Sequence, residues 1–227
     1  EQLLLQQSQR GIVADVPRVG RHLVFGLGDA QALPRCLAEL AQVPDDGTLV
    51  FGLGLQSLAH LGDAARRVPG MREFPALQGH GIVVPSTPLA AWCWLRGEDS
   101  GTLLRRGRAV ERMLAPALVL RDAIDTFRHG RGPNGHGLDL TGYEDGTENP
   151  PLEEAPPIAL LQDAGEGLDG SSFAALQQWV HDFTAFEGLT ETARDHMMGR
   201  RLTDNEEIED APPSAHVKRT AQESFDP

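Results

Sequence analysis

The chain has 227 residues and a mass of 24.6 kDa, enough for one large domain or two small ones. Its 33 acidic and 20 basic residues give a formal net charge of −13 at pH 7. Because a field of that sign repels phosphate backbones and anionic lipids, we expect neither nucleic acid nor a membrane surface as a partner. Hydrophobic residues make up 40% of the chain and charged residues 23%, which is typical of a folded globular protein.

The two cysteines predict a reducing compartment. Cys36 and Cys93 are far apart in the sequence and have apolar neighbours, a pattern that favours buried free thiols over a disulfide. No apolar run approaches the roughly 20 residues that a membrane helix needs, and the first residues lack the basic-then-apolar pattern of a signal peptide. We therefore expect a cytoplasmic protein.

The hexapeptide LVFGLG occurs twice, at Leu23–Gly28 and at Leu49–Gly54, and both copies predict buried strands. Between them, residues 31–42 have leucines at helical spacing, and a turn at 44–47 leads into the second copy. The next predicted elements, in chain order, are strands at 81–84 and 89–95, a helix at 102–114 and a strand at 119–127.

A glycine-rich basic loop, Arg128–Gly137, marks the predicted domain boundary. We expect an N-terminal domain over residues 1–133 and a C-terminal domain over residues 134–227. Four prolines in Pro150–Pro157 indicate an irregular segment. After it, the pattern predicts a strand at Ser172–Phe183 and a short helix at Leu189–Met198. Strands alternate with helices in both halves of the chain, which predicts an α+β fold. One form of this fold is an α+β sandwich that occurs twice, once in each half.

Several common active-site motifs are incomplete or absent. Gln31 and Ser57 occupy the third glycine position of the two GLG copies, so neither completes a dinucleotide-binding G-x-G-x-x-G, and we interpret these glycines as close packing at strand ends. The chain has no G-x-S-x-G, P-loop, H-E-x-x-H or paired C-x-x-C. No two histidines are spaced for a helical metal site, whereas the single histidine of a haem site needs no such spacing.

The string Gly142-Tyr143-Glu144-Asp145-Gly146-Thr147 is the most informative segment of the chain. Taken alone, its Asp-Gly pair predicts a tight turn. The whole string, continued by Glu148-Asn149-Pro150, resembles the Gly-[Phe/Tyr]-x-Asp-Gly-Thr signature of the dye-decolourising peroxidases. A second block agrees, because Gly199-Arg200 and the later Ser214–Arg219 resemble the segment with that family's proximal histidine.

This resemblance implies two ferredoxin-like domains of the dimeric α+β barrel type, with antiparallel sheets and flanking helices. It implies haem b in the C-terminal domain, with one iron per chain. The activity implied is reduction of hydrogen peroxide through a ferryl intermediate, with one-electron oxidation of aromatic, dye-like donors. A homo-oligomer and an encapsulating protein shell are partners that the family would allow.

The resemblance also assigns roles to residues. His216 would be the axial ligand of the iron, and Asp145 the distal group that moves the peroxide proton, first as base and then as acid. The other ring nitrogen of the histidine would donate a hydrogen bond to a carboxylate. There are three candidate acceptors, which the sequence does not rank: Glu206, Glu207 and Glu209. The residues that would line or bind the haem are Gly146, Thr147, Glu148 and Arg200. Two roles are open for Arg200: it binds a haem propionate, or it is an ordinary surface arginine.

One departure from the family concerns the end of the chain. Members have a distal arginine downstream of the proximal histidine, and this chain stops at Pro227, before such a residue. We therefore expect the sequence to be clipped at its C-terminus. Two other functions are open: a non-catalytic haem-binding or iron-handling protein on the same fold, and a haem-free scaffold.

Overall fold

The computed structural model of the chain describes residues 2–63 and 68–221. They form two compact units. Unit 1 contains Glu1–Arg128 and Pro150–Ala174, and unit 2 contains His129–Asn149 and Ala175–Pro227. The chain thus enters unit 2 just before the predicted boundary at residue 133, and it returns to unit 1 once before its final passage into unit 2.

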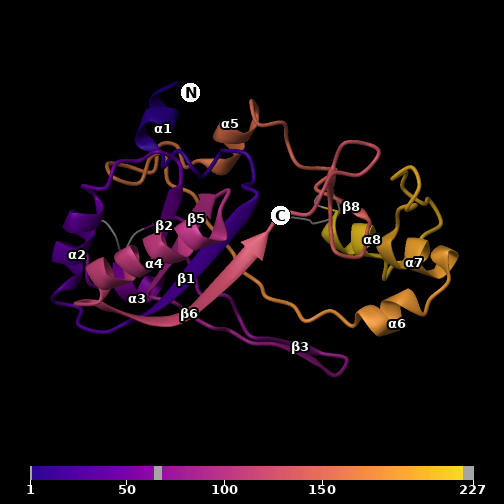
Figure 1. The fold of residues 1–227 in the computed structure, drawn as a ribbon, viewed down its shortest axis with the longest axis horizontal. Helices are drawn as coiled ribbons and strands as arrows, with labels where there is room; N and C mark the ends of the chain where they lie inside the picture. Colours follow the sequence, from indigo (N-terminus) through magenta and orange to yellow (C-terminus); the bar gives the residue numbers. More distant parts are fainter. Residues whose placement is uncertain (1, 64–67, 222–227) are drawn as a thin grey trace. The chain divides into compact units, whose positions relative to one another are not determined.

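Unit 1 is built on a four-stranded antiparallel sheet with the strand order β2-β5-β1-β6. Its elements, in chain order, are β1 (Val19–Leu27), α2 (Leu33–Leu40), β2 (Leu49–Leu53), β5 (Ala91–Gly97), α4 (Ser100–Leu114) and β6 (Leu118–Phe127). Figure 1 shows α2 and α4 together on one face of this sheet. This β-α-β-β-α-β order is the ferredoxin-like arrangement. The predicted α+β fold class is confirmed.

Alternation along the strands produces the core of unit 1. Leu23 and Phe25 of β1, and Cys93 and Leu95 of β5, point to the helix-covered face and are at most 2% exposed. The apolar side chains of α2 and α4 pack against them. Cys36 and Cys93 are both buried and free, as predicted. Burial raises the pKa of the Cys93 thiol, which keeps it protonated and unreactive.

The opposite face of the sheet has a cluster of three rings. His22 stacks on Trp92 and on Trp94, with ring centroids 5.8 and 5.7 Å apart. The indole N–H of Trp92 donates to Nδ1 of His22 at 3.0 Å. Burial lowers the pKa of His22, so the neutral ring that can accept this hydrogen bond is favoured.

The GLG glycines lie at tight strand ends. A Cβ on Gly54 would lie 1.7 Å from the carbonyl oxygen of Leu89, so only glycine fits. A Cβ on Gly28 would lie 3.1 Å from the carbonyl oxygen of Ala117. The interpretation of these glycines as close packing is confirmed.

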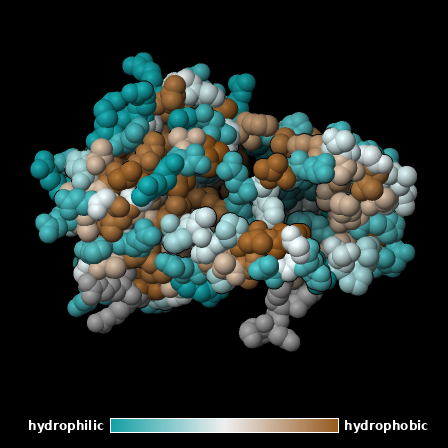
Figure 2. Space-filling model, turned by 90° about the horizontal axis from the view of Figure 1, so that it is seen from below, coloured by the Kyte–Doolittle hydropathy of each residue, from teal (hydrophilic) through white to brown (hydrophobic). Residues whose placement is uncertain are grey.

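Short elements complete unit 1: α1 (Gln2–Gln7), α3 (Leu55–Leu58), β3 (Leu77–Gly79), β4 (Ile82–Val84) and α5 (Ala155–Ala159). The β3–β4 hairpin exposes Leu77, Ile82 and Val83 by 51 to 62%, and Figure 2 shows apolar residues breaking through the hydrophilic surface in patches. The prediction that Pro150–Pro157 is wholly irregular was wrong, because Pro156 and Pro157 occupy the first turn of α5, where proline is tolerated.

Unit 2 contains the two-stranded ladder of β7 (Gly137–Leu138) and β8 (Glu144–Asp145), followed by α6 (Phe183–Glu187), α7 (Glu191–Met198) and α8 (His216–Thr220). The predicted helix at 189–198 is confirmed by α7. The predicted strand at Ser172–Phe183 was wrong: the backbone there has no ladder, and Val180 is 98% exposed. Over residues 2–63 and 68–221, no helix is long and apolar enough to cross a membrane.

Candidate functional site

The signature string folds as a hairpin followed by a second turn. β7 and β8 pair through Gly137 with Asp145 and Leu138 with Glu144. The turn between them closes with a 3.1 Å hydrogen bond from the N–H of Gly142 to the carbonyl oxygen of Asp139, with Gly142 at φ +89°. Gly146, at φ +75°, opens the next turn. The predicted turn is therefore confirmed, but Asp145 itself lies in the strand between two turns.

Tyr143 anchors the hairpin to α7. Its side chain is buried, and its hydroxyl donates to Oδ1 of Asp195 at 2.5 Å. Phe186 contacts the phenol ring edge-on, with centroids 6.2 Å apart. Burial, together with the hydrogen bond to Asp195 and its negative charge, raises the pKa of Tyr143. The phenol therefore stays protonated as a hydrogen-bond donor.

A second set of contacts joins the end of the string to the segment after α7. Asn205 donates from Nδ2 to Oγ1 of Thr147 at 2.8 Å. Arg200 donates from Nη1 to the carbonyl oxygen of Asn205 at 2.9 Å and from Nη2 to Oε1 of Glu148 at 2.7 Å. Asn205, which the motif does not contain, thus joins Thr147 to Arg200, and Arg200 in turn pairs directly with Glu148.

The segment that leads to His216 is held by the end of α7. Gly199 ends this helix at φ +84°, and its N–H donates to the carbonyl oxygen of Asp195 at 2.7 Å. A Cβ on Gly199 would lie only 2.2 Å from Cγ1 of Val217, the residue after His216. α8 therefore packs on a glycine surface that no other residue could provide.

The two predicted chemical groups, Asp145 and His216, are both exposed. Oδ1 of Asp145 accepts the N–H of Gly146 at 2.8 Å, and Oδ2 is open. Within the described part of unit 2, no hydrogen bond or ion pair joins Asp145 to His216, and none involves the His216 ring. Of its three candidate acceptors, Glu207 instead pairs with Lys218 at 2.7 Å.

Sequence reasoning missed Asn205 and Asp195. Asn205 is 8% exposed and has a φ of +60°, which asparagine adopts more readily than most residues. A lone Asn between charged residues could have suggested this conformation, but not its two partners. Asp195 is one of two acidic residues in α7, and no local signal distinguishes it from Glu191.

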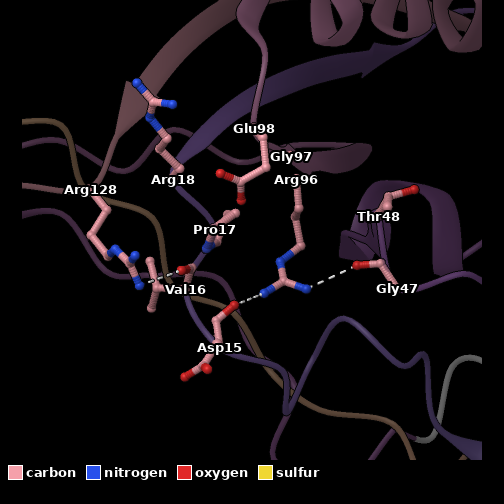
Figure 3. Close-up of a pocket in the computed structure, with 10 residues that line it drawn as sticks. All are labelled: Asp15, Val16, Pro17, Arg18, Gly47, Thr48, Arg96, Gly97, Glu98 and Arg128. Atoms are coloured by element: carbon pink, nitrogen blue, oxygen red, sulfur yellow. Dashed lines mark hydrogen bonds between the residues drawn. The ribbon is translucent and has the colours of Figure 1, made fainter.

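A cavity of about 360 Å³ in unit 1 is lined by several charged residues (Figure 3). Arg96, which is 6% exposed, donates to the carbonyl oxygens of Gly47 at 2.9 Å and of Asp15. Arg128 donates to the carbonyl oxygen of Val16 at 3.0 Å, and Figure 3 shows the guanidinium of Arg18 turned away from Arg96. Arg96 and Arg128 hold backbone segments together, so we interpret the cavity as structural.

Residues 136–226 match the family model described as Dyp-type peroxidase, C-terminal. The chain is 27% identical over 156 residues to a dye-decolorizing peroxidase of Mycobacterium tuberculosis, covering 68% of this chain and 45% of the relative. It is 26% identical over 214 residues to a dye-decolorizing peroxidase of Rhodococcus erythropolis, covering 88% and 61%.

Solved structures agree on the fold. A DypB variant from Rhodococcus jostii RHA1, in complex with heme, has a TM-score of 0.75 at 22% identity, covering 93% of this chain and 72% of that one. The encapsulated DyP-type peroxidase of Mycobacterium smegmatis has a TM-score of 0.69 at 21% identity, with coverage of 93% and 71%. The chain is an α+β protein of the ferredoxin-like class with a Gly-x-x-Asp-Gly hairpin in its second unit. Its residues 136–226 are similar to the C-terminal part of Dyp-type peroxidases.

The chain spans about half the length of the curated relatives that it matches, since the alignments cover 41 to 61% of those proteins. Activity, substrates and partners are therefore properties of the whole protein.

Proposed function

We propose that the protein is a haem b peroxidase that reduces hydrogen peroxide and oxidises aromatic, dye-like donors by one-electron steps. In this proposal His216 is the axial ligand, and Asp145 is the catalytic residue on the opposite side. The haem-binding part lies within residues 134–227. The match of residues 136–226 to the C-terminal model of Dyp-type peroxidases supports the proposal, as does the heme complex among the similar solved structures.

The residues of unit 2 fit such a group. His216 is exposed and its imidazole has no hydrogen bond to a described residue, so a ring nitrogen is available to an iron. At Gly146, Nδ2 of Asn149 lies 2.7 Å from the place of a Cβ, so this side chain must turn away before a flat ring can approach the backbone there. Arg200 is a donor for a carboxylate, and its present partner Glu148 has a side chain 83% exposed, so a haem propionate could replace it. When bound, haem supplies the redox chemistry with peroxide.

Asp145 would move the proton. Its Oδ2 has no partner among the described residues, while Oδ1 is held by the N–H of Gly146, which orients the carboxylate. Oδ2 would take the proton from one peroxide oxygen and return it to the other, so that water can leave. The single observation that carries this role is the anchoring of the strand: Tyr143 is fixed to Asp195 and Thr147 to Asn205, while Oδ2 of Asp145, between them, has no partner among the described residues.

Stopped-flow mixing of the haem-loaded protein with hydrogen peroxide tests this function. We expect Asp145→Asn to slow the reaction by about 10²- to 10⁴-fold without changing the spectrum of the resting haem. Glu187→Gln, at an exposed carboxylate of α6, is the matched control and should react like the wild type. A wild-type protein that binds haem but does not react with peroxide would instead indicate a haem carrier.

We also propose a cytoplasmic homo-oligomer, enclosed by a protein shell in the cell. The encapsulated relative from Mycobacterium smegmatis supports the shell. Co-expression with a shell protein and sedimentation analysis would test this part, and a protein that sediments as a free monomer would contradict it.

A further inference from the structure

Glu144, the residue before Asp145, has an unusual set of contacts. Its Oε1 accepts the backbone N–H of Asn134 at 2.8 Å and Nδ2 of the same residue at 3.3 Å. Its Oε2 is buried and has no hydrogen-bond partner among the described residues. The carboxylate therefore points inward, away from solvent, and meets the glycine-rich loop that precedes β7.

Gly132 makes room for this side chain. A Cβ on Gly132 would lie 2.0 Å from Oε1 and 2.4 Å from Cγ of Glu144. The φ of Gly132 is not in the left-handed region, so its backbone is open to any residue. Glycine is required there because of the Glu144 side chain, not because of the backbone conformation.

The loop around Gly132 is a compact unit of its own. The N–H of Gly132 donates to the carbonyl oxygen of His136 at 2.8 Å, and the N–H of Leu138 donates to that of Gly130 at 3.0 Å. Arg131 donates to the carbonyl oxygen of Gly135 at 2.9 Å. Residues 130–138 are thus tied together by their own hydrogen bonds. The β7–β8 ladder joins the end of this segment to β8, and Glu144 adds a side-chain contact at Asn134.

Successive side chains of a strand point to opposite sides. Tyr143 is anchored to α7 on one side, and Glu144 is anchored to the loop on the other. The strand is thus held on both faces immediately before Asp145, whose carboxylate has only the neighbouring N–H of Gly146. The orientation of Asp145 depends on how firmly these two residues are held.

We propose that Glu144 is a positioning residue, which clamps the 130–138 loop to β8 and so fixes the direction of Asp145. The clamp is independent of any cofactor, and its effect on catalysis rests on the proposed function. The contact depends on Oε1 as a hydrogen-bond acceptor. It does not depend on the negative charge of the carboxylate, because Oε2 makes no hydrogen bond to a described residue. Glutamine therefore replaces glutamate at this position, and alanine does not.

Amide hydrogen exchange of the haem-free chain tests the clamp directly. In Glu144→Ala the N–H of Asn134 loses its acceptor, and we expect its exchange to quicken about tenfold. Glu144→Gln should retain the wild-type rate, as should the control Glu187→Ala. In Gly132→Ala the new methyl group displaces the Glu144 side chain from its place against the loop. This variant should therefore reproduce the effect of Glu144→Ala. Unchanged exchange at Asn134 in both disruptive variants would overturn the clamp.

The haem-loaded protein then tests the positioning. We expect Glu144→Ala to lower the rate with peroxide and to leave the resting haem spectrum unchanged, and Glu144→Gln to restore the rate. If Glu144→Gln has wild-type exchange but reacts as slowly as Glu144→Ala, the charge matters and the positioning role is wrong. A wild-type protein that fails to react with peroxide would contradict the proposed function. The exchange rate at Asn134 would still show whether Glu144 holds the loop.

Discussion

Oδ1 of Asp195 accepts two hydrogen bonds, from the hydroxyl of Tyr143 at 2.5 Å and from the backbone N–H of Leu202 at 3.1 Å. One carboxylate oxygen thus joins the signature hairpin to α7 and to the segment that follows it. This relationship makes Tyr143 more than a hydrophobic residue of the motif, and its removal has measurable consequences.

Tyr143→Phe should lower the free energy of unfolding by about 2 kcal/mol, because a buried hydrogen bond to a charged group is lost while the ring remains. Urea unfolding measures the difference. Trp179→Phe is the control, since Trp179 is 55% exposed and its indole bonds only to Gln177. We expect that control within about 0.5 kcal/mol of the wild type. Equal stabilities for all three proteins would show that the bond to Asp195 contributes nothing.

The stability that Tyr143 contributes should also depend on pH. The pKa of Tyr143 is raised in the folded chain, whereas a tyrosine in the unfolded chain titrates at about pH 10. Below that pH the contribution is complete. Above it the unfolded phenol ionises while the folded one does not, so stability falls as pH rises toward the folded pKa. Because Tyr143 is the only tyrosine, ultraviolet absorbance of phenolate reports this residue alone. Phenolate that forms near pH 10 without unfolding would contradict the expectation.

Two substitutions of Asn205 should separate the cost of backbone strain from the cost of the lost hydrogen bond. Asn205→Gly removes the contact with Thr147 but keeps the left-handed backbone, and should cost about 1 kcal/mol. Asn205→Ala loses the same contact and adds about 1–2 kcal/mol of strain at φ +60°. Thermal unfolding of both variants gives the comparison. An alanine variant as stable as the glycine variant would mean that the backbone relaxes out of this conformation.

Gly199 should be less tolerant than a glycine of similar conformation elsewhere. Gly199→Ala and Gly62→Ala both place alanine at positive φ, +84° and +91°, but a Cβ on Gly62 meets no atom of the described residues within 4 Å. We expect Gly199→Ala to cost at least about 1 kcal/mol more, because of the contact with Val217. Adding Val217→Ala should recover part of that loss. Equal losses at the two glycines would argue against tight packing of α8.

Much of unit 1 is predictable from sequence, because its signals are local. The two LVFGLG copies are strands in the structure, since apolar alternation and strand-end glycines act within a few residues. The adjacency of β1 to β5 and β6 was not predictable, since hydrogen-bonded neighbours are chosen by the whole sheet.

Unit 2 shows where such signals fail. The apolar residues of Ser172–Phe183 resemble a strand, but a strand also needs a neighbour with which to share hydrogen bonds, and the described residues offer none there. In the site, the motif identifies Asp145, Thr147 and Glu148. Asn205 lies 58 residues after its partner Thr147, and Asp195 lies 52 residues after its partner Tyr143. Their roles come from folding, and no spacing rule reveals them.

The central claim is that His216 holds a haem iron, and titration of the haem-free protein with haemin tests it most directly. We predict that the wild type binds haemin with a Soret band typical of histidine ligation, and that His216→Ala loses or displaces that band while it remains folded. His181→Ala, at an exposed histidine of the same unit, should behave like the wild type. A His216→Ala variant with the same Soret band and the same haemin affinity as the wild type would contradict the account.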